Sequence, residues 1–238
     1  MDVVSLVPSA TETLLAWGVT PIAVTRFCEQ PSLRPVGGTK DPDVPAIVAL
    51  RPDLVVLCEE ENRREDAEAL TEAGLAIHVI RIDAVADVGP ELDRLASALE
   101  LERPQSARSS VPAPPTPRAT AVVPIWRRPW MTMNAGTYGS SVLAHAGIAN
   151  VFGADATRYP SFELEDAVAL QPDVVVAPSE PYPFTERHRA ELEQVAPVVF
   201  VDGQDLFWWG VRTAAAVARL RVQLETIRRA PGTRPPTA

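Results

Sequence analysis

The hydrophobic and polar positions along the chain follow two alternating patterns. Short runs of β-branched and apolar residues, typical of buried strands, alternate with segments whose apolar residues recur at helical spacing. Strands that alternate with helices of about ten residues predict parallel sheets covered on both faces. The expected strands are 3–7, 22–26, 54–58, 76–82, 119–126, 174–178 and 198–202, with a short element at 150–152. The expected helices are 9–17, 44–50, 63–73, 84–101, 137–146, 163–170, 185–195 and 210–229.

Local signals mark the ends of some of these elements. The run Ser9-Ala10-Thr11-Glu12 matches a capping box, so the first helix is expected to begin there. The helix 84–101, at ~1.5 Å per residue, would form a rod of roughly 25 Å. The segment that follows it is rich in proline, which predicts an irregular or polyproline-like linker.

Two stretches of the chain match at a separation of 120 residues. Residues 48–57 (VALRPDLVVL) read again as residues 168–177 (VALQPDVVVA). In each copy, Pro-Asp ends a helix and a buried strand follows, which predicts two similar α/β lobes in tandem. Small ligands bind in clefts between such domains. The expected organisation is an N-terminal α/β lobe (1–83), a backbone helix plus Pro-rich linker (84–118), a C-terminal α/β lobe (119–230) and a disordered tail (231–238).

Length and charge narrow the function. The 238 residues can hold two lobes of roughly 100 residues, each with its own core. The net charge is −9, and the 22 Lys and Arg are dispersed among 31 carboxylates, which argues against a nucleic-acid partner. No apolar run reaches the ~18 residues of a membrane span.

The N-terminus and the cysteines bear on the compartment. Met1 leads directly into an apolar strand, without the basic region and cleavage site of a signal peptide, so a cytoplasmic location is expected for the sequence as it stands. Cys28 and Cys58 have no metal-ligand spacing. Two ordinary thiols are favoured over a disulfide between them.

Several motifs, in the same order along the chain, resemble a known family. They are VSLVPSATE at 4–12, VGGTK at 36–40, LRPDLV at 50–55, EEENR at 59–63, PIWRRPWM at 124–131 and PSEPYPF at 178–184. Together they resemble the cobalamin and iron-siderophore binding proteins of ABC importers, the helical-backbone metal receptors, which have a periplasmic-binding-protein-like fold. The resemblance runs from residue 3 to about residue 220.

The resemblance implies a fold and a function. The fold would be two Rossmann-like α/β lobes with parallel sheets joined by a single backbone helix, here 84–101, although the Pro-rich stretch 103–117 replaces helix that members usually carry. The function would be to bind a metal chelate, a corrinoid such as cobalamin or a ferric siderophore, and to deliver it to an ABC permease. No catalysis and no intrinsic cofactor are implied, and a monomer is expected. If the N-terminus is incomplete, the resemblance implies a periplasmic or other extracytoplasmic location.

Aromatic residues gather at the predicted strand ends, where ligands of parallel sheets bind. Aromatic rings offer a large contact area at little cost in entropy, which suits the broad face of a chelate. The alternative is that these rings pack the edges of the two cores. The candidate ligand contacts are Phe27, Trp126, Trp130, Tyr182, Phe184, Trp208 and Trp209.

Charged residues near the same strand ends form a second set of candidates. Glu60 and Glu180 correspond under the offset of 120 residues and are expected to face the mouth of the cleft. Solvated carboxylates at a loop are the simpler interpretation. Arg63, Arg127 and Arg128 could hold an anionic siderophore by charge-assisted hydrogen bonds, or could pair with nearby glutamates.

Acidic residues at two predicted helix starts are candidates for docking to a permease. In the family, carboxylates on the top of each lobe engage basic pockets of the permease, and Glu65, Asp66 and Glu186 occupy related places. Acidic residues also favour helix N-termini for electrostatic reasons, which explains them almost as well.

An enzyme is the alternative of another class. A chelatase-like cytosolic protein would place a His and an acid opposite each other, and a sugar-nucleotide enzyme would need a Gly-rich phosphate loop. The only candidate loop, 37–40, belongs to the family motif. The three histidines, His78, His145 and His188, have no ligand spacing, so a metal site built by the protein is not expected.

Overall fold

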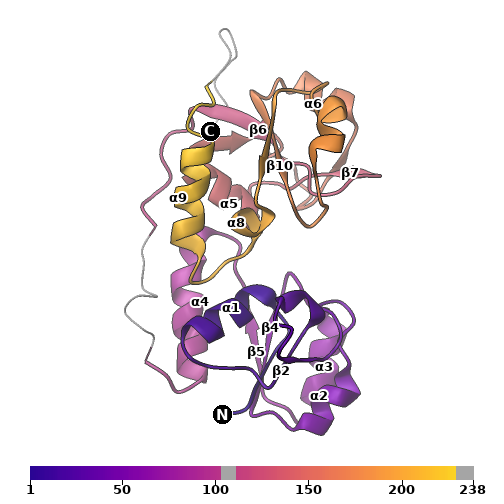
Figure 1. The fold of residues 1–238 in the computed structure, drawn as a ribbon, viewed down its shortest axis with the longest axis vertical. Helices are drawn as coiled ribbons and strands as arrows, with labels where there is room; N and C mark the ends of the chain where they lie inside the picture. The colour runs from indigo at the N-terminus through magenta and orange to yellow at the C-terminus, as the bar shows by residue number, and fades with distance from the viewer. Residues whose placement is uncertain (103–110, 229–238) are drawn as a thin grey trace. The chain divides into compact units, whose positions relative to one another are not determined.

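A computed structural model describes residues 1–102 and 111–228. The chain divides into two compact units (Figure 1). The first contains Met1–Ile82, residues 86–102 and Trp209–Arg212, and the second contains Asp83–Val85, residues 111–208 and residues 213–228. Most of the predicted Pro-rich segment, 103–110, and the predicted disordered tail, 231–238, lie outside the described residues.

The first unit is built on a five-stranded parallel sheet with the strand order β3-β2-β1-β4-β5. Its strands are β1 (Val3–Ser5), β2 (Ala23–Val24), β3 (Arg34–Pro35), β4 (Leu54–Cys58) and β5 (Ile77–Ile80). Its helices are α1 (Pro8–Ala16), the short 3-10 helix η1 (Arg26–Cys28), α2 (Val44–Leu50), α3 (Arg64–Glu72) and α4 (Val85–Ala98), whose first residue counts with the second unit. Helices α1 and α4 lie on one side of the strands and α2 and α3 on the other (Figure 1). Every residue of β1 and β4 is therefore buried, as the apolar runs predict.

The second unit has a four-stranded parallel sheet with the order β11-β10-β6-β8 and a small antiparallel pair, β7-β9. Its strands are β6 (Ala119–Val122), β7 (Trp130–Met131), β8 (Ile148–Asn150), β9 (Ser161–Phe162), β10 (Val174–Pro178) and β11 (Val198–Val201). Its helices are α5 (Tyr138–His145), α6 (Leu164–Ala169), the 3-10 helix η3 (Glu186–His188), α7 (Arg189–Leu192), α8 (Gly203–Phe207) and α9 (Thr213–Gln223). Helices α5, α8 and α9 lie together on one side of β6 and β10 (Figure 1).

The repeat found in the sequence has the same structural role in both units. Strands β4 and β10 begin and end 120 residues apart. The carboxylate of Asp53 accepts a hydrogen bond from the backbone N–H of Asp2 at 2.6 Å, and that of Asp173 accepts one from the N–H of Thr120 at 2.8 Å. The Pro-Asp pair thus ties the start of the central strand to its neighbour in each sheet. The prediction of an α/β fold with parallel sheets is confirmed.

The expected capping box at Ser9 is wrong. Helix α1 begins at Pro8, and no side chain caps its N-terminus. Proline is favoured at the first helical position because its missing N–H has no partner there in any helix. The start therefore moves one residue earlier, which places Ser9 and Glu12 inside the helix and leaves the Glu12 carboxylate free for another partner.

Other elements differ from the sequence-based expectation because tertiary contacts change where helices and strands begin and end. The expected final helix 210–229 is two helices, α8 and α9, because Trp209–Arg212 between them packs with the first unit. The expected strand 119–126 ends at Val122. Strands β3, β7 and β9 were not expected, since two residues are too few to show a period. The expected helix 185–195 is broken into η3 and α7.

Candidate functional site

The candidate site of the second unit lies at the carboxyl ends of β6 and β10, which form the topological switch point of its sheet. These strands are parallel neighbours, and the chain connects from them in opposite directions across the sheet. Ligands of open α/β sheets bind outside the carboxyl ends of the strands at such switch points. The segments that follow β6 and β10 carry Trp126 and Tyr182, so the topology brings these two predicted contacts together.

Trp126 belongs to a hairpin that extends from the end of β6. The N–H of Ile125 donates to the carbonyl of Met131 at 2.8 Å, and the N–H of Met131 donates to the carbonyl of Trp126 at 3.1 Å. At the tip, Arg128 has φ of 70°, a left-handed conformation that costs a non-glycine residue free energy. The hairpin holds the Trp126 ring outward, and 45% of that residue is exposed.

Rings of the hairpin pack against rings of the segment after β10. We define the aromatic cluster as Trp126, Trp130, Tyr182 and Phe184. The rings of Trp126 and Tyr182 meet edge to face with centroids 5.7 Å apart, and Tyr182 contacts Phe184 at 4.8 Å. Trp130 stacks on Phe184 at 6.0 Å with an interplanar angle of 8°. Trp130 and Phe184 are only 9% and 3% exposed, so they pack the core, whereas Trp126 and Tyr182 present ring surface to solvent.

His188 lies against this cluster and was not expected to be part of the site. Its ring contacts those of Tyr182 and Phe184 edge to face, each at 5.5 Å, and the residue is 4% exposed. Burial lowers the pKa of His188, and the charges of Arg187 and Arg127 lower it further. Sequence reasoning missed it because a histidine without ligand spacing has no local signature.

The arginines of the hairpin have different environments. The Arg127 guanidinium pairs with the Glu191 carboxylate, with Nε 2.9 Å from Oε2, and lies over the ring of Trp130. Arg127 therefore takes the role of partner to a glutamate. Arg128 is exposed, and no hydrogen bond or ion pair joins it to any residue in the described part of the chain.

Two further candidates of the second unit lie after β10 and β11. Glu180 packs against the start of α8: a Cβ added at Gly203 would come within 2.4 Å of the Glu180 Cγ. Trp208 is half-buried, and its carbonyl accepts a hydrogen bond from the Tyr138 hydroxyl at 3.4 Å. Both positions are held by the packing of α8, which sequence reasoning did not expect.

In the first unit, the segments after β1 and β4 are held together by Asn62. Its Oδ1 accepts from the N–H of Cys58 at 2.8 Å, and its Nδ2 donates to the carbonyls of Thr39 at 2.9 Å and Leu6 at 3.3 Å. Asn62 thus joins three of the segments whose motifs carry the family resemblance. The sequence showed its position in the EEENR motif but not this role.

The predicted contacts Glu60 and Phe27 are exposed in the first unit. The carbonyl of Glu60 accepts a hydrogen bond from the Lys40 ammonium at 2.9 Å. Phe27 is 49% exposed on η1, and the guanidinium of Arg26 lies 4.8 Å from its ring centroid. Cys28, the next residue, and Cys58 are buried free thiols, as expected.

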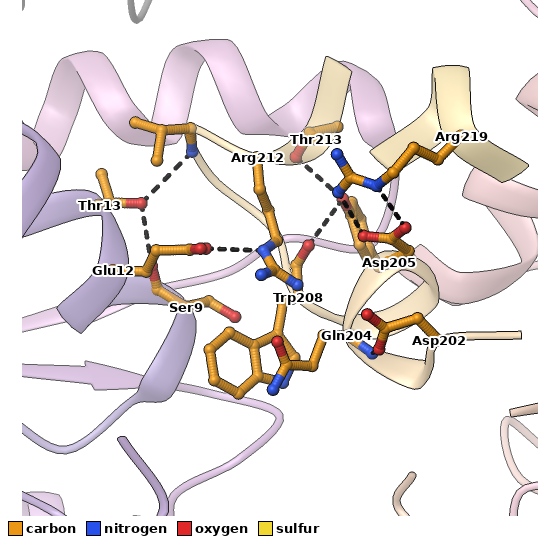
Figure 2. Close-up of polar contacts among 12 residues, drawn as sticks. Ser9, Glu12, Thr13, Asp202, Gln204, Asp205, Trp208, Arg212, Thr213 and Arg219 are labelled. Carbon is orange, nitrogen blue, oxygen red and sulfur yellow. Dashed lines mark hydrogen bonds and ion pairs between the residues drawn. The ribbon is translucent and has the colours of Figure 1, made fainter. Parts of the chain in front are cut away.

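The segment Trp209–Arg212 also belongs to the first unit. Arg212 Nε lies 2.8 Å from the Glu12 carboxylate, and the N–H of Val211 donates to Thr13 Oγ1 at 3.4 Å (Figure 2). Trp209, a predicted contact, is buried with 3% exposed. The partner that Glu12 gains here is 200 residues away in sequence.

The candidate docking residues lie in the first turns of two helices. Glu65 is exposed on α3, whereas Asp66 pairs with Arg63 at 3.1 Å. Glu186, on η3, pairs with Arg189 at 2.6 Å and keeps 73% of its side chain exposed. Within the described residues, no three His, Cys, Asp or Glu side chains meet so as to hold a metal ion. No described helix has the length and apolar character needed to cross a membrane.

Comparison with known proteins gives consistent results for sequence and fold. No family model matches the chain. The vitamin B12-binding protein of Salmonella paratyphi A is 23% identical over 188 residues, covering 73% of this chain and 71% of the relative. That of Vibrio parahaemolyticus is 25% identical over 202 residues, covering 78% and 70%.

Solved structures of similar fold include two kinds of binding protein. The periplasmic vitamin B12 binding protein BtuF of Vibrio cholerae has a TM-score of 0.73 at 20% identity, covering 94% of this chain and 96% of that one. A periplasmic heme binding protein from Pseudomonas aeruginosa has a TM-score of 0.74 at 21% identity, covering 100% and 95%. The periplasmic heme-binding protein BhuT, solved with two hemes, has a TM-score of 0.73 at 19% identity, covering 94% and 97%.

These likenesses define the class: a two-lobed α/β fold of the periplasmic-binding-protein type. Within that class, the predicted resemblance to the cobalamin and iron-siderophore substrate-binding proteins of ABC importers is confirmed. The chelatase-like alternative is not favoured, because the similar proteins are binding proteins.

Proposed function

We propose that this chain is the substrate-binding protein of an ABC importer and that it holds a metal chelate, a corrinoid or a heme, without chemical change. The observation that carries the proposal is the contact between exposed Trp126 and half-buried Tyr182 at the switch point of the second sheet. Named relatives that bind vitamin B12 or heme support it. Both ligands offer a broad flat face, which suits two rings held on a buried base.

The buried rings of the aromatic cluster, Trp130 and Phe184, hold Trp126 and Tyr182 in place before a ligand binds. Trp130 stacks on Phe184, and Arg127 is held by Glu191, so few side chains need to be ordered on binding. Less ordering means that less free energy is lost on association. We therefore propose Trp126 and Tyr182 as direct contacts. Phe27, Glu60, Glu180 and Trp208 remain proposed contacts from the resemblance, and Trp130, Phe184 and Trp209 are assigned to the cores.

Calorimetric titration with cobalamin, heme and ferric siderophores tests the proposal. A face of Trp126 covered by ligand contributes about 1–2 kcal/mol, so Trp126→Ala should weaken binding by about 5- to 30-fold. Leu170→Ala is the matched control, because Leu170 is 46% exposed but follows α6 at the opposite end of β10. Failure of every chelate to bind at micromolar concentration would exclude this function.

Delivery and location are further parts of the proposal. Several similar structures are described as periplasmic, and we propose an extracytoplasmic location and a monomeric state for this chain as well. Glu65 and Glu186 are the proposed contacts to a permease, and Asp66, next to Glu65, is held by Arg63. Glu65→Lys and Glu186→Lys should reduce co-purification with the permease, whereas Glu68→Lys on the same helix as Glu65 should not. Cell fractionation and sedimentation test the location and the monomer.

A further inference from the structure

His188 is buried against the rings of Tyr182 and Phe184 in the aromatic cluster. It follows the loop that connects β10 to η3, and that loop carries Tyr182. The backbone N–H of Thr185 donates to His188 Nδ1 at 3.0 Å, while His188 Nε2 lies 3.4 Å from the Tyr182 hydroxyl. One imidazole therefore contacts both the backbone that ends the loop and the phenol that the loop presents.

Two donors point at the ring nitrogens of His188. The backbone N–H of Thr185 donates to Nδ1 at 3.0 Å, and Arg187 Nε–H donates to Nε2 at 3.2 Å. The Tyr182 hydroxyl, 3.4 Å from Nε2, can donate to that nitrogen or accept from it. The neutral ring keeps one lone pair for these donors, whereas the protonated ring keeps none.

The charged groups around His188 favour the neutral ring. Arg187 lies on the same 3-10 turn and Arg127 approaches from the hairpin, while Glu191 of α7 opposes them and is itself paired with Arg127. Tyr182, from the preceding loop, is the other titratable neighbour. Burial is the largest effect that lowers the pKa of His188, and the two arginines act in the same direction.

We propose that His188 is a positioning residue that holds Tyr182 against the chelate, and that protonation of its ring releases Tyr182 and weakens ligand binding in acid. This inference rests on the proposed function. The protonated ring carries an N–H on both nitrogens, so one would oppose the N–H of Thr185 at 3.0 Å and the other would oppose Arg187 Nε–H at 3.2 Å. The new charge would also lie beside two arginines. The loop that carries Tyr182 must move to relieve both conflicts.

Two substitutions separate the contacts of the imidazole. His188→Asn keeps an acceptor near the N–H of Thr185 but cannot reach Tyr182, and His188→Gln keeps an amide at the distance of Nε2 that can form a hydrogen bond with the Tyr182 hydroxyl. Neither side chain titrates near neutral pH. His145→Asn is the matched control, because His145 is also buried in the second unit but contacts the Ser141 carbonyl of its own helix. Circular dichroism at each pH identifies variants that remain folded.

The affinity for the chelate that binds the wild type is then measured from pH 7.5 to pH 5. Wild type and His145→Asn should lose about tenfold or more, with the change below pH 6.5, the ordinary pKa of histidine. Folded His188→Asn should bind more weakly at pH 7.5 and show no such change, and His188→Gln should recover part of the affinity. A wild-type pH profile in both His188 variants would overturn the inference.

Tryptophan fluorescence of the unliganded protein provides a readout that needs no chelate. Wild type and His145→Asn should show an acid transition that both His188 variants lack, because the rings of Trp126 and Tyr182 are in contact. If no chelate binds but this transition appears, the proposed function fails and the loop switch stands. If a chelate binds and the transition is the same in all variants, only the inference on His188 fails.

Discussion

Gly210 is the position where one added methyl group tests the packing of the first unit. Its φ is +110°, and a Cβ built there would lie 2.2 Å from the Thr13 hydroxyl oxygen (Figure 2 shows Thr13). Two separate effects should therefore destabilise the Gly210→Ala protein. The backbone conformation costs about 1–2 kcal/mol for an L-residue. The overlap adds about 1–3 kcal/mol as overpacking in a tight site.

Two companion variants separate these costs. Gly74→Ala, in the same unit, has φ of +81° but no atom within 4 Å of the built Cβ, so it reports the backbone cost alone. Thr13→Ala removes the clashing oxygen and leaves Thr13 Cβ at 3.6 Å, an ordinary contact. By itself it also loses the hydrogen bonds to the Ser9 carbonyl and from the Val211 N–H, worth about 0.5–1.5 kcal/mol each.

Urea unfolding followed by circular dichroism measures these free energies. Gly210→Ala should be less stable than Gly74→Ala by about 1–3 kcal/mol, the overlap alone. The Gly210→Ala/Thr13→Ala double variant should lose less unfolding free energy than the two single variants lose together, by a similar amount. If Gly210→Ala costs no more than Gly74→Ala, or if Thr13→Ala gives no rescue, the close contact between Gly210 and α1 is wrong.

Further predictions concern other buried positions. Asn62→Ala should destabilise the protein by about 2–4 kcal/mol in urea unfolding, because the buried N–H of Cys58 loses its acceptor; Asn62→Asp keeps that acceptor but turns a buried carboxylate oxygen toward the carbonyls of Thr39 and Leu6, so it should cost at least as much. Trp130→Ala should cost about 3–5 kcal/mol through the cavity left above Phe184, and a loss below 1 kcal/mol would contradict its burial. Burial raises the pKa of Cys58 to about 12, so iodoacetamide should label it at pH 8 only after unfolding. The lowered pKa of His188 means that the unfolded chain binds its proton more strongly, so stability should fall as pH drops below 6.5, and His188→Asn should lack that component in acid titration.

Elements with strong local signals could be predicted from the sequence with accurate bounds. Helix α2 and strands β4 and β10 begin and end where expected. A buried parallel strand is apolar along its whole length, and Pro-Asp marks its start, so neighbours in sequence are sufficient to find it. The capping box failed because Pro8 competed for the same helix start.

The candidate site was predicted only in part. The sequence grouped the aromatic residues at the strand ends, and the structure does bring Trp126 and Tyr182 together. It could not separate them from Trp130 and Phe184, because exposure depends on what packs above each ring. His188 had no signal at all, since its role comes from contacts that appear only when the loop is folded.

The sequence by itself determined the alternation of strands and helices, the repeat of two α/β units and the family resemblance, because these depend on patterns between neighbouring residues. Tertiary structure alone decided which aromatic rings face solvent, why the last helix is interrupted at Trp209–Arg212, and that Glu12 pairs with Arg212 instead of capping its own helix. Burial and ion pairing are set by partners far apart in the chain, and only the folded backbone brings those partners within contact distance.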